Sequence, residues 1–241
     1  MSVYKRTHMC GELRKENIGE SVVLNGWIQK RRNLGGLIFC DVRDKTGITQ
    51  VVFNDQIPQE LFDRADRLRS EYVVGIKGKV MERESKNADL PTGDIEVFAD
   101  DLIIYSEADT PPIYIKDDDN VDDNLRLKYR YLDLRKKKMQ DNLTFRHNLA
   151  KLTRDYFAEN GFTEVETPIL TTLLTGASAR PFITHHNTQD LDMYLRIALE
   201  LPLKRLLVGG MEAVYEIGRV FRNEGMDPRH NPEFTLMEAY L

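Results

Sequence analysis

The 241-residue sequence has few of the features that mark secreted, membrane-embedded or metal-dependent proteins. Its only cysteines, Cys10 and Cys40, lie far apart, which argues against a disulfide framework or a cysteine-based metal site. No apolar run approaches the length that crosses a bilayer, and the N-terminus lacks the apolar core of a signal peptide. We therefore expect a cytoplasmic protein without membrane contacts.

The sequence also lacks an excess of positive charge and any familiar phosphate loop. It has 34 basic and 39 acidic residues, a net charge of -5, so nucleic-acid binding would need a local basic patch. Neither GxGxxG nor GxxxxGK[ST] occurs, so a nucleotide site would have to be built differently. Adjacent His185 and His186 would point to opposite faces of a strand, so we expect no transition metal ligated by this chain.

Turn residues divide the first 110 residues into five runs with the alternation of strands. The runs are Ser21–Trp27, Leu37–Asp41, Ile48–Phe53, Tyr72–Val80 and Ile95–Tyr105. Between the third and fourth, apolar residues recur at helical spacing within residues 58–70. This order predicts an OB-fold barrel, a frequent binder of single-stranded nucleic acid, although the count alone also allows an SH3-like barrel or a sandwich.

One stretch of this module, residues 26–53, combines positive charge, an aromatic ring and an amide. Lys30 and Arg32 precede a glycine turn, Phe39 follows it, and Gln50 lies on the next predicted strand. Such a set suits unstacked bases, which offer a face for stacking and an edge for hydrogen bonds. A basic hairpin with a core phenylalanine is the alternative.

Two charged runs follow the module. The acidic run at residues 117–123 is typical of a solvated linker. Residues 126–138 hold seven basic side chains and one acidic one, which suggests a surface that faces nucleic-acid phosphates. The start of a plain surface helix is the alternative.

The second half begins with a predicted helix and ends with a predicted hairpin. Four apolar residues recur at helical spacing from Asp141, and Asn160-Gly161 supplies a stop signal. GFTEVETPIL then predicts a buried strand that ends at Thr167-Pro168. Residues 221–240, FRNEGMDPRHNPEFTLMEAY, indicate a long-looped antiparallel hairpin.

Alternation along the hairpin places a chemically rich set of side chains on one face. The set comprises Glu216, Gly218, Val220, Arg222, Glu224, Phe234, Leu236, Glu238 and Tyr240. Arginine binds phosphate, phenylalanine stacks on a base, and carboxylates hold metal ions or an ammonium group. The face therefore suits a phosphorylated aromatic ligand, and the alternative is a solvated hairpin whose charges pair with each other.

These segments resemble class II aminoacyl-tRNA synthetases of the aspartyl, asparaginyl and lysyl group. RTHMCGEL, residues 26–53, SEYVVGIKG and LPTGDIEV resemble the anticodon-binding domain of bacterial aspartyl enzymes, and LRLKYRYLDLR resembles their hinge. FRNEG, RHNPEF and TLMEAY resemble the second signature motif of lysyl enzymes. Residues 1–170 are thus similar to aspartyl enzymes and residues 171–241 to lysyl enzymes. A recombination, a fusion or a sequence-assembly error would produce such a junction near residue 168.

The resemblance implies an α+β chain in which an all-β OB-fold barrel precedes a partial class II antiparallel-sheet catalytic domain. The expected parts are an anticodon-binding domain at 1–110, a hinge at 111–138 and a catalytic part at 139–241 that stops after the second motif. The helix and strand around Pro168 resemble the first motif, which implies a homodimer interface there.

Site residues follow by the same resemblance at matching positions. Anticodon contacts are implied for Phe39, Gln50, Lys30, Arg32 and Glu96. Amino-acid binding is implied for Gly176, Glu200, Glu238 and Tyr240. ATP binding is implied for Arg222 at the α-phosphate, for Glu224 and Phe234 at adenine, and for Arg229 and His230 at the pyrophosphate end. Arg222 and Glu224 are also the expected catalytic residues.

The implied reaction joins an amino acid to tRNA with ATP and Mg²⁺. The amino-acid carboxylate attacks the α-phosphate, and the terminal ribose hydroxyl of tRNA then takes the acyl group. The two carboxylates of the pocket favour lysine, whereas the first half favours an aspartate-type tRNA. Because the third motif and most magnesium ligands would follow residue 241, we expect this chain alone to be inactive. A tRNA-binding module without catalysis and a non-functional hybrid reading frame are the alternatives.

Overall fold

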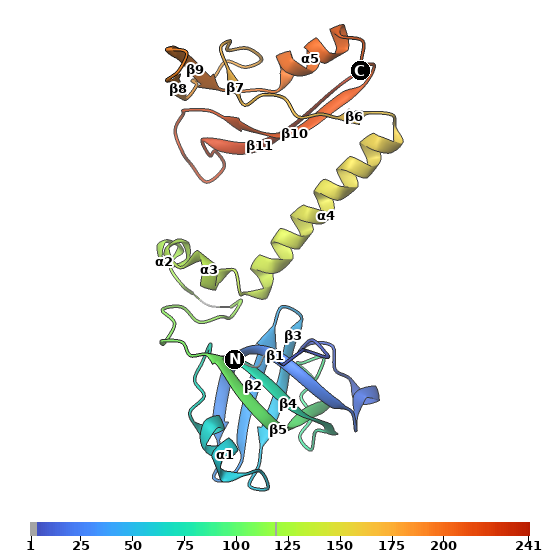
Figure 1. Ribbon diagram of the computed structural model, residues 1–241, viewed down its shortest axis with the longest axis vertical. Coiled ribbons are helices and arrows are strands. Elements are labelled where there is room, and N and C mark those ends of the chain that lie inside the picture. The colour runs from blue at the N-terminus through green and yellow to red at the C-terminus, as the bar shows by residue number, and fades with distance from the viewer. Residues whose placement is uncertain (1–3, 119) are drawn as a thin grey trace. The chain divides into compact units, whose positions relative to one another are not determined.

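The computed structural model describes residues 4–118 and 120–241. It divides into two compact units, one up to Leu143 and the other Thr144–Leu241, and helix α4 (Lys137–Glu159) belongs partly to each (Figure 1). Asp119, within the predicted acidic linker, lies outside the described residues. In the described chain, no helix is both long and apolar enough to cross a membrane.

The first unit is built on a closed barrel with the strand order β1-β2-β3-β5-β4. The strands are β1 Ser21–Asn33, β2 Ile38–Asp44, β3 Gly47–Phe53, β4 Val73–Glu82 and β5 Ile95–Ser106. Helix α1 (Gln59–Asp66) follows β3, and a short 3-10 helix η1 (Lys15–Asn17) precedes β1. The closed order with one helix after the third strand confirms the OB-fold prediction.

Strand β1 closes the barrel because it pairs with two neighbours in succession. Its first part, to Trp27, pairs with β4, and the part from Trp27 to Asn33 pairs with β2. Gly26 stands at this change of partner, where an added Cβ would lie 2.5 Å from the Arg43 carbonyl oxygen. Apolar residues from all five strands fill the interior, among them Leu24, Ile38, Phe53, Ile76 and Leu102.

The segment after the barrel contains two short helices, α2 (Asp123–Lys128) and α3 (Arg130–Asp133). Ile113, Ile115 and Leu132 form its small buried cluster. The Asp122 carboxylate accepts the Asn124 N–H at 2.9 Å and so caps α2.

This segment meets the barrel at a buried ion cluster centred on Glu71, which is 4% exposed. Its carboxylate accepts two hydrogen bonds at 2.9 Å from Arg43 on β2 and one at 2.6 Å from Arg135. Both guanidinium groups also lie over the Trp27 ring, at 5.8 and 4.8 Å from its centroid. Glu71 has a φ of 66°, so the cluster holds a non-glycine residue in the left-handed region.

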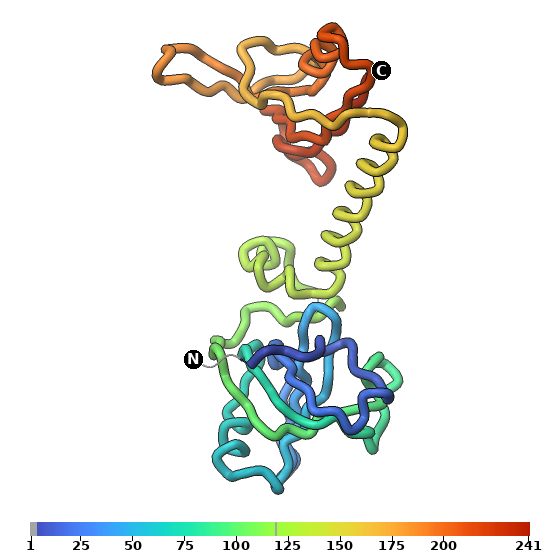
Figure 2. Tube along the Cα trace, turned by 45° about the vertical axis from the view of Figure 1, so that its right-hand side comes forward, coloured from blue at the N-terminus to red at the C-terminus, as the bar shows by residue number. Residues whose placement is uncertain are grey.

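The second unit contains two three-stranded sheets, in the orders β11-β10-β6 and β7-β9-β8 (Figure 1). The elements are β6 Thr163–Glu164, β7 Leu170–Thr171, β8 Ile183–His186, β9 Leu191–Leu195, α5 Glu200–Val208, β10 Val214–Phe221 and β11 Glu233–Tyr240. Helix α5 packs on β10 and β11 around Leu199, Leu203, Val214 and Val220. The β8–β9 hairpin projects from the rest of this unit (Figure 2). The fold is therefore α+β, as predicted.

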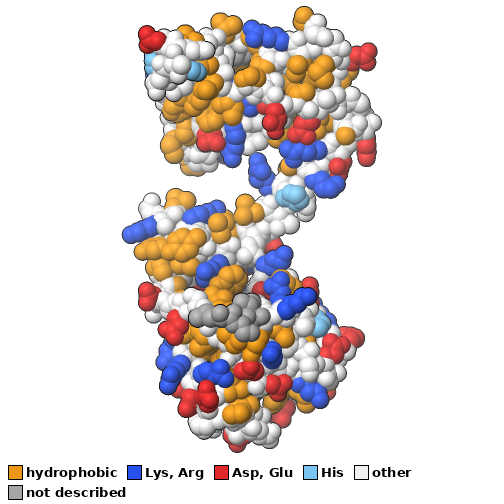
Figure 3. Space-filling model, viewed as in Figure 1, with side chains coloured by type: hydrophobic (Ala, Val, Ile, Leu, Met, Phe, Trp, Pro, Cys, Tyr) orange, Lys and Arg blue, Asp and Glu red, His pale blue; other side chains and the backbone are white. Residues whose placement is uncertain are grey.

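The prediction of a buried strand over GFTEVETPIL was wrong. Thr163 and Glu164 form the short exposed strand β6, which pairs in parallel with the start of β10, residues 165–169 form no strand, and Leu170 begins β7. Helix α4 forms as predicted but begins at Lys137, and none of its residues is buried. Its apolar stripe is exposed, and Figure 3 shows further hydrophobic side chains, in orange, on the surface of both units. The stripe comprises Phe145, Leu149, Leu152 and Tyr156, which are 53 to 70% exposed.

Candidate ATP, amino-acid and RNA sites

The C-terminal hairpin has the pairing that the sequence predicts. Val220 pairs with Phe234, and Glu216 pairs with Glu238. Directly paired residues share a face of the sheet, so the predicted face exists along β10 and β11. Because β10 ends at Phe221, Arg222 lies just beyond the strand rather than within it.

Arg222 and Phe234 lie together at the loop end of this hairpin. The Arg222 N–H donates to the Pro232 carbonyl oxygen at 2.8 Å, which continues the pairing past β10. Its guanidinium carbon is 5.2 Å from the Phe234 ring centroid, and its Nε donates to the Ile197 carbonyl oxygen at 3.5 Å. Glu224 follows on the exposed part of the loop. The structure thus brings an anion-binding group and a stacking ring together.

Asp227 organises the loop between the strands. Its carboxylate accepts the backbone N–H groups of Arg229 at 2.7 Å and His230 at 2.9 Å, and it contacts His230 Nδ1 at 2.7 Å. The bond from the Arg229 N–H, followed by the bond to the imidazole, lowers the pKa of Asp227. Both predicted pyrophosphate contacts, Arg229 and His230, therefore lie on an exposed but internally bonded loop.

The four predicted amino-acid contacts form one group around the start of α5. A Cβ added to Gly176 would lie 3.1 Å from the Glu200 Cβ, and the φ of 87° independently favours glycine. Glu238 accepts the Leu199 N–H at 3.1 Å through Oε1 and the Tyr240 hydroxyl at 2.7 Å through Oε2. Burial, followed by the bond to Glu238, raises the pKa of Tyr240.

Lys204 belongs to this group, and the sequence interpretation missed it. Its Nζ lies 2.5 Å from Glu200 Oε1 and 5.5 Å from the Tyr240 ring centroid. The i,i+4 spacing of the two residues on a helix is the signal that could have found the pair. Lys204 thus already supplies an ammonium group to the predicted ammonium site.

A buried ion pair lies on the same face of the hairpin. Arg196 Nη2 is 2.7 Å from Glu216 Oε1, and both side chains are 5% exposed. Arg196 also donates to the Thr167 and Arg219 carbonyl oxygens. Gly218 leaves the room for this pair, since an added Cβ would lie 2.4 Å from Arg196 Nη2. Glu216, predicted on the ligand face, is therefore engaged internally.

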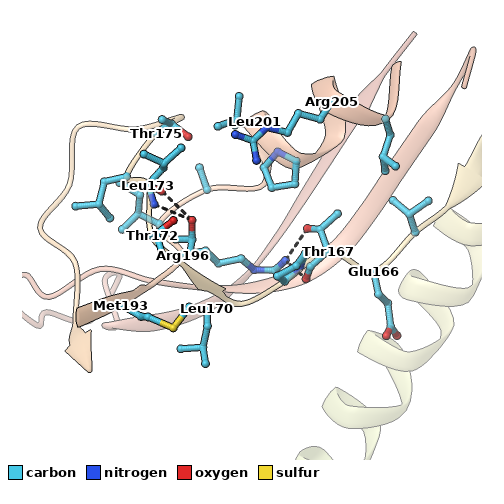
Figure 4. A pocket seen from close by; sticks show the side chains of 18 residues that line it. Glu166, Thr167, Leu170, Thr172, Leu173, Thr175, Met193, Arg196, Leu201 and Arg205 are labelled. Carbon is cyan, nitrogen blue, oxygen red and sulfur yellow. Dashed lines mark hydrogen bonds between the residues drawn. The ribbon is translucent and has the colours of Figure 1, made fainter. Parts of the chain in front are cut away.

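A separate pocket of about 700 Å³ lies between residues 165–175 and α5 (Figure 4). Leu170, Leu173 and Leu201 line it together with Arg205 (Figure 4). Of the predicted site residues only Pro168 lines it. The pocket is therefore distinct from the predicted ATP and amino-acid contacts.

On the barrel, all five predicted anticodon contacts lie on one outer face. Strand register aligns them in two rows across β1, β2, β3 and β5. One row is Arg32, Phe39, Val52 and Phe98, and the other is Lys30, Asp41, Gln50 and Glu96. A groove of about 600 Å³ covers this face, and its lining includes every member of the rows except Lys30 and Asp41.

Polar bonds fix the Gln50 amide within this face. Its Nε2 donates to Glu96 Oε2 at 2.7 Å, and its Oε1 accepts from Arg32 Nη2 at 3.1 Å. The Arg32 guanidinium carbon is also 5.8 Å from the Phe39 ring centroid. Burial raises the pKa of Glu96 and the pKa of Asp41, because each carboxylate loses hydration on this surface.

The basic run after the barrel is only partly available to a partner. Asp133 is fully buried and pairs with Arg126 at 3.1 Å, Arg130 at 2.7 Å and Lys136 at 3.1 Å. Arg135 is bonded to Glu71. Lys137 pairs with Asp141 at 2.6 Å, so five of the seven basic side chains have internal ion-pair partners, and the run is not the uniform phosphate-facing surface that its composition suggests.

The described residues hold no cluster of three or more His, Cys, Asp and Glu that would bind a metal ion. His185 instead lies 2.9 Å from Asp192 and 3.3 Å from Asp190 on the β8–β9 hairpin. His186 Nδ1 accepts the Gln189 N–H at 3.3 Å.

Comparison with known proteins places both units. Residues 22–105 match the family of OB-fold nucleic acid binding domains, and residues 122–241 match the class II tRNA synthetases (D, K and N). The aspartate--tRNA ligase of Clostridium botulinum (strain Langeland / NCTC 10281 / Type F) is 43% identical over 237 residues, 98% of this chain and 40% of that protein. The aspartate--tRNA ligase of Clostridium tetani (strain Massachusetts / E88) is 44% identical over 237 residues, which again are 98% of this chain and 40% of that protein.

The chain spans about 40% of the length of these relatives. Their alignment covers both sides of residue 168, so they do not divide the chain there and do not support a lysyl-type origin of residues 171–241. With an OB-fold domain ahead of a partial class II catalytic domain, the chain belongs to the class II tRNA synthetases of the D, K and N group.

Proposed function

We propose that the chain acts in the ATP-dependent ligation of an amino acid to tRNA. One observation carries this proposal: segment 197–200 anchors both halves of the catalytic face. The Ile197 carbonyl accepts from Arg222, which lies against Phe234, and the Leu199 N–H donates to Glu238. One short segment of backbone therefore holds both the phosphate-binding arginine and the amino-acid pocket.

In this proposal the chain positions reactants and neutralises charge. Phe234 stacks on adenine, and Glu224 accepts a hydrogen bond from the adenine amino group. Arg222 holds the α-phosphate beside the amino-acid carboxylate that attacks it. Arg229 and His230 contact the departing pyrophosphate. Mg²⁺ is expected to accompany ATP in this proposal, and the described residues hold no group of three or more His, Cys, Asp and Glu side chains that could bind the ion by itself.

For the first candidate, the amino acid is aspartate, because the relatives that align across both units are aspartate--tRNA ligases. Its side-chain carboxylate needs a cation, and Lys204 is the cation that lies in the group around α5. Lysine is the second candidate. The Glu200 and Glu238 carboxylates favour ammonium groups, and a lysine substrate would displace Lys204 from Glu200.

Binding of non-hydrolysable adenylate analogues tests these candidates without requiring turnover. An aspartyl-adenylate analogue should raise the melting temperature of this chain more than the lysyl analogue does. The opposite order would establish the second candidate, and no shift with either would reject amino-acid binding here.

On the barrel face, Phe39 stacks on an anticodon base and Gln50 forms hydrogen bonds to the edge of a base. Glu96 holds the Gln50 amide in place. Lys30 and Arg32 neutralise phosphate groups of the RNA. The partner in this proposal is a cytoplasmic aspartate-type tRNA. Phe39→Ala should weaken binding of an aspartate anticodon hairpin RNA by tenfold or more, since one stacked base contributes about 1–3 kcal/mol. Equal binding by the variant would contradict the assignment.

The predicted homodimer around Pro168 is likewise a proposal. The exposed apolar stripe on α4 supports it, because large apolar patches commonly mark interfaces. Sedimentation should show a dimer that Leu149→Lys converts to a monomer. A wild-type monomer at micromolar concentration would contradict the proposal.

A further inference from the structure

Phe98 on β5 occupies a position on the RNA face that mirrors Phe39. Val52 pairs with Phe39 on one side and with Phe98 on the other, so the three residues form one row across β2, β3 and β5. Adjacent strands lie about 4.8 Å apart, which separates the two aromatic positions by about 10 Å. No anticodon role was assigned to Phe98 from the sequence.

Burial shows that this row points away from the barrel interior. Val97 and Ala99 belong to the barrel core, so the alternation of β5 turns Phe98 outward. On β3, Val51 and Phe53 belong to the core, whereas Val52 is outside that cluster although it is only 2% exposed. Its neighbours on the outer face therefore cover Val52, and Phe98 is one of them.

The groove over this face extends beyond Phe39. Its lining includes both phenylalanines, with Leu34 and Met81 at its apolar rim and 68% and 40% exposed. Lys79, which pairs with Phe98 across β4 and β5, is exposed at the end of the row. A second ring beside a cation is a suitable environment for a nucleotide.

We propose that Phe98 is a second stacking surface, so that the barrel face holds two splayed bases of the RNA loop, one on Phe39 and one on Phe98, with Val52 as the floor between them. Unstacked loop bases commonly bind to aromatic side chains in this manner. The inference rests on the proposed RNA binding by this face. Lys79 neutralises the phosphate that accompanies the second base.

The test combines protein variants with abasic RNAs. Hairpin RNAs with the aspartate anticodon loop are titrated against the whole chain carrying Phe98→Leu, Phe98→Tyr or Phe39→Leu. We expect Phe98→Leu to weaken binding about tenfold and Phe98→Tyr to preserve it. Removing the base that stacks on Phe98 should cancel the loss of affinity caused by Phe98→Leu, because that RNA has no base left to stack there. The loss caused by Phe39→Leu should be cancelled by an abasic site at a different loop position.

The outcomes separate this inference from the proposed function. The inference fails if Phe98→Leu lowers the affinity for every abasic RNA by the same factor, or does not lower it, while the effect of Phe39→Leu depends on which base is missing. Phe98 then only shields Val52. If wild type does not bind the hairpin, the proposed RNA function fails as well. Tyr114→Leu, at a 70% exposed aromatic residue outside the groove, is the matched control and should bind like wild type.

Discussion

The barrel and the second unit differ in how much apolar surface each covers by itself. Every strand of the barrel contributes fully buried side chains to one core. In the second unit the described core is a small cluster under α5, and the 23 residues of α4 include none that is buried. The barrel is therefore stabilised by its own packing, whereas the second unit relies more on polar and aromatic contacts.

The polar and aromatic contacts of the second unit join a few specific residues. At the end of α4, the Phe157 ring stacks on Tyr215 with centroids 4.9 Å apart, and Tyr215 donates to Glu164 at 3.1 Å. Arg196 and Glu216 add the buried ion pair. A unit held in this way should be sensitive to the loss of single polar groups, while the barrel should be sensitive to the loss of apolar volume.

The largest predicted effect is on the buried ion pair. Arg196→Ala should lower the stability of the second unit by about 3–5 kcal/mol, because it leaves the Glu216 charge buried and unpaired. Urea unfolding followed by hydrogen exchange of β10 amides measures it. Arg219→Ala is the control, since its pair with Glu233 is 54% exposed and contributes at most about 1 kcal/mol. Equal effects of both variants would contradict the role of the buried pair.

Next in size is the contrast between apolar truncations in the two units. Leu24→Ala in the barrel should cost about 2–5 kcal/mol by creating a cavity. Leu152→Ala, at a 66% exposed position on α4, should change stability by less than about 0.5 kcal/mol in the monomer. Melting curves at low protein concentration compare them. A large loss for Leu152→Ala under those conditions would break the comparison between the units.

A smaller effect is expected at Gly176. Alanine there would have to adopt a φ of 87° and place its Cβ 2.9 Å from the Ala198 Cβ, which costs about 1–2 kcal/mol in backbone strain alone. The loop should shift away from Glu200, and the affinity for an adenylate analogue should fall about tenfold by calorimetry. Gly209→Ala, with its nearest contact at 3.2 Å and a φ of -73°, should bind normally.

The smallest predicted effect concerns pH and the barrel face. Burial raises the pKa of Glu96 above its unfolded value, so its ionised form opposes folding at neutral pH, and this cost is lost as pH falls from the folded pKa to below the unfolded pKa. Glu96→Gln should therefore raise the melting temperature at pH 7 more than at pH 4. A gain that is equal at both pH values would show that ionisation of Glu96 is not its cause.

The sequence predicted elements well where local pattern decides structure. Alternating apolar residues and turn signals located all five barrel strands, and the pairing of Val220 with Phe234 followed from the same alternation. At GFTEVETPIL the alternation was misleading. The strand pairing with β10 covers only Thr163 and Glu164, so it ends before Pro168, and Leu170 pairs instead with Leu195 of β9.

Contacts between distant segments could not be predicted in this way. Arg196 reaches Glu216 only because Gly218 leaves space beside it, and nothing local in RIALEL signals that partner. The ion pairs that the buried Asp133 and Glu71 form with four side chains of the basic run are equally invisible to composition. For residue roles, resemblance gave the candidates, and the structure shows which of them lie together.

Trp27 gives the molecule a built-in spectroscopic probe. It is the only tryptophan of the chain, and the guanidinium groups of Arg43 and Arg135, which Glu71 holds in place, both lie over its ring. Indole emission depends on the charges beside the ring, so the fluorescence of the unmodified protein reports on one junction. Any movement of Arg135 away from the barrel, during folding or on RNA binding, should change that emission without an added label.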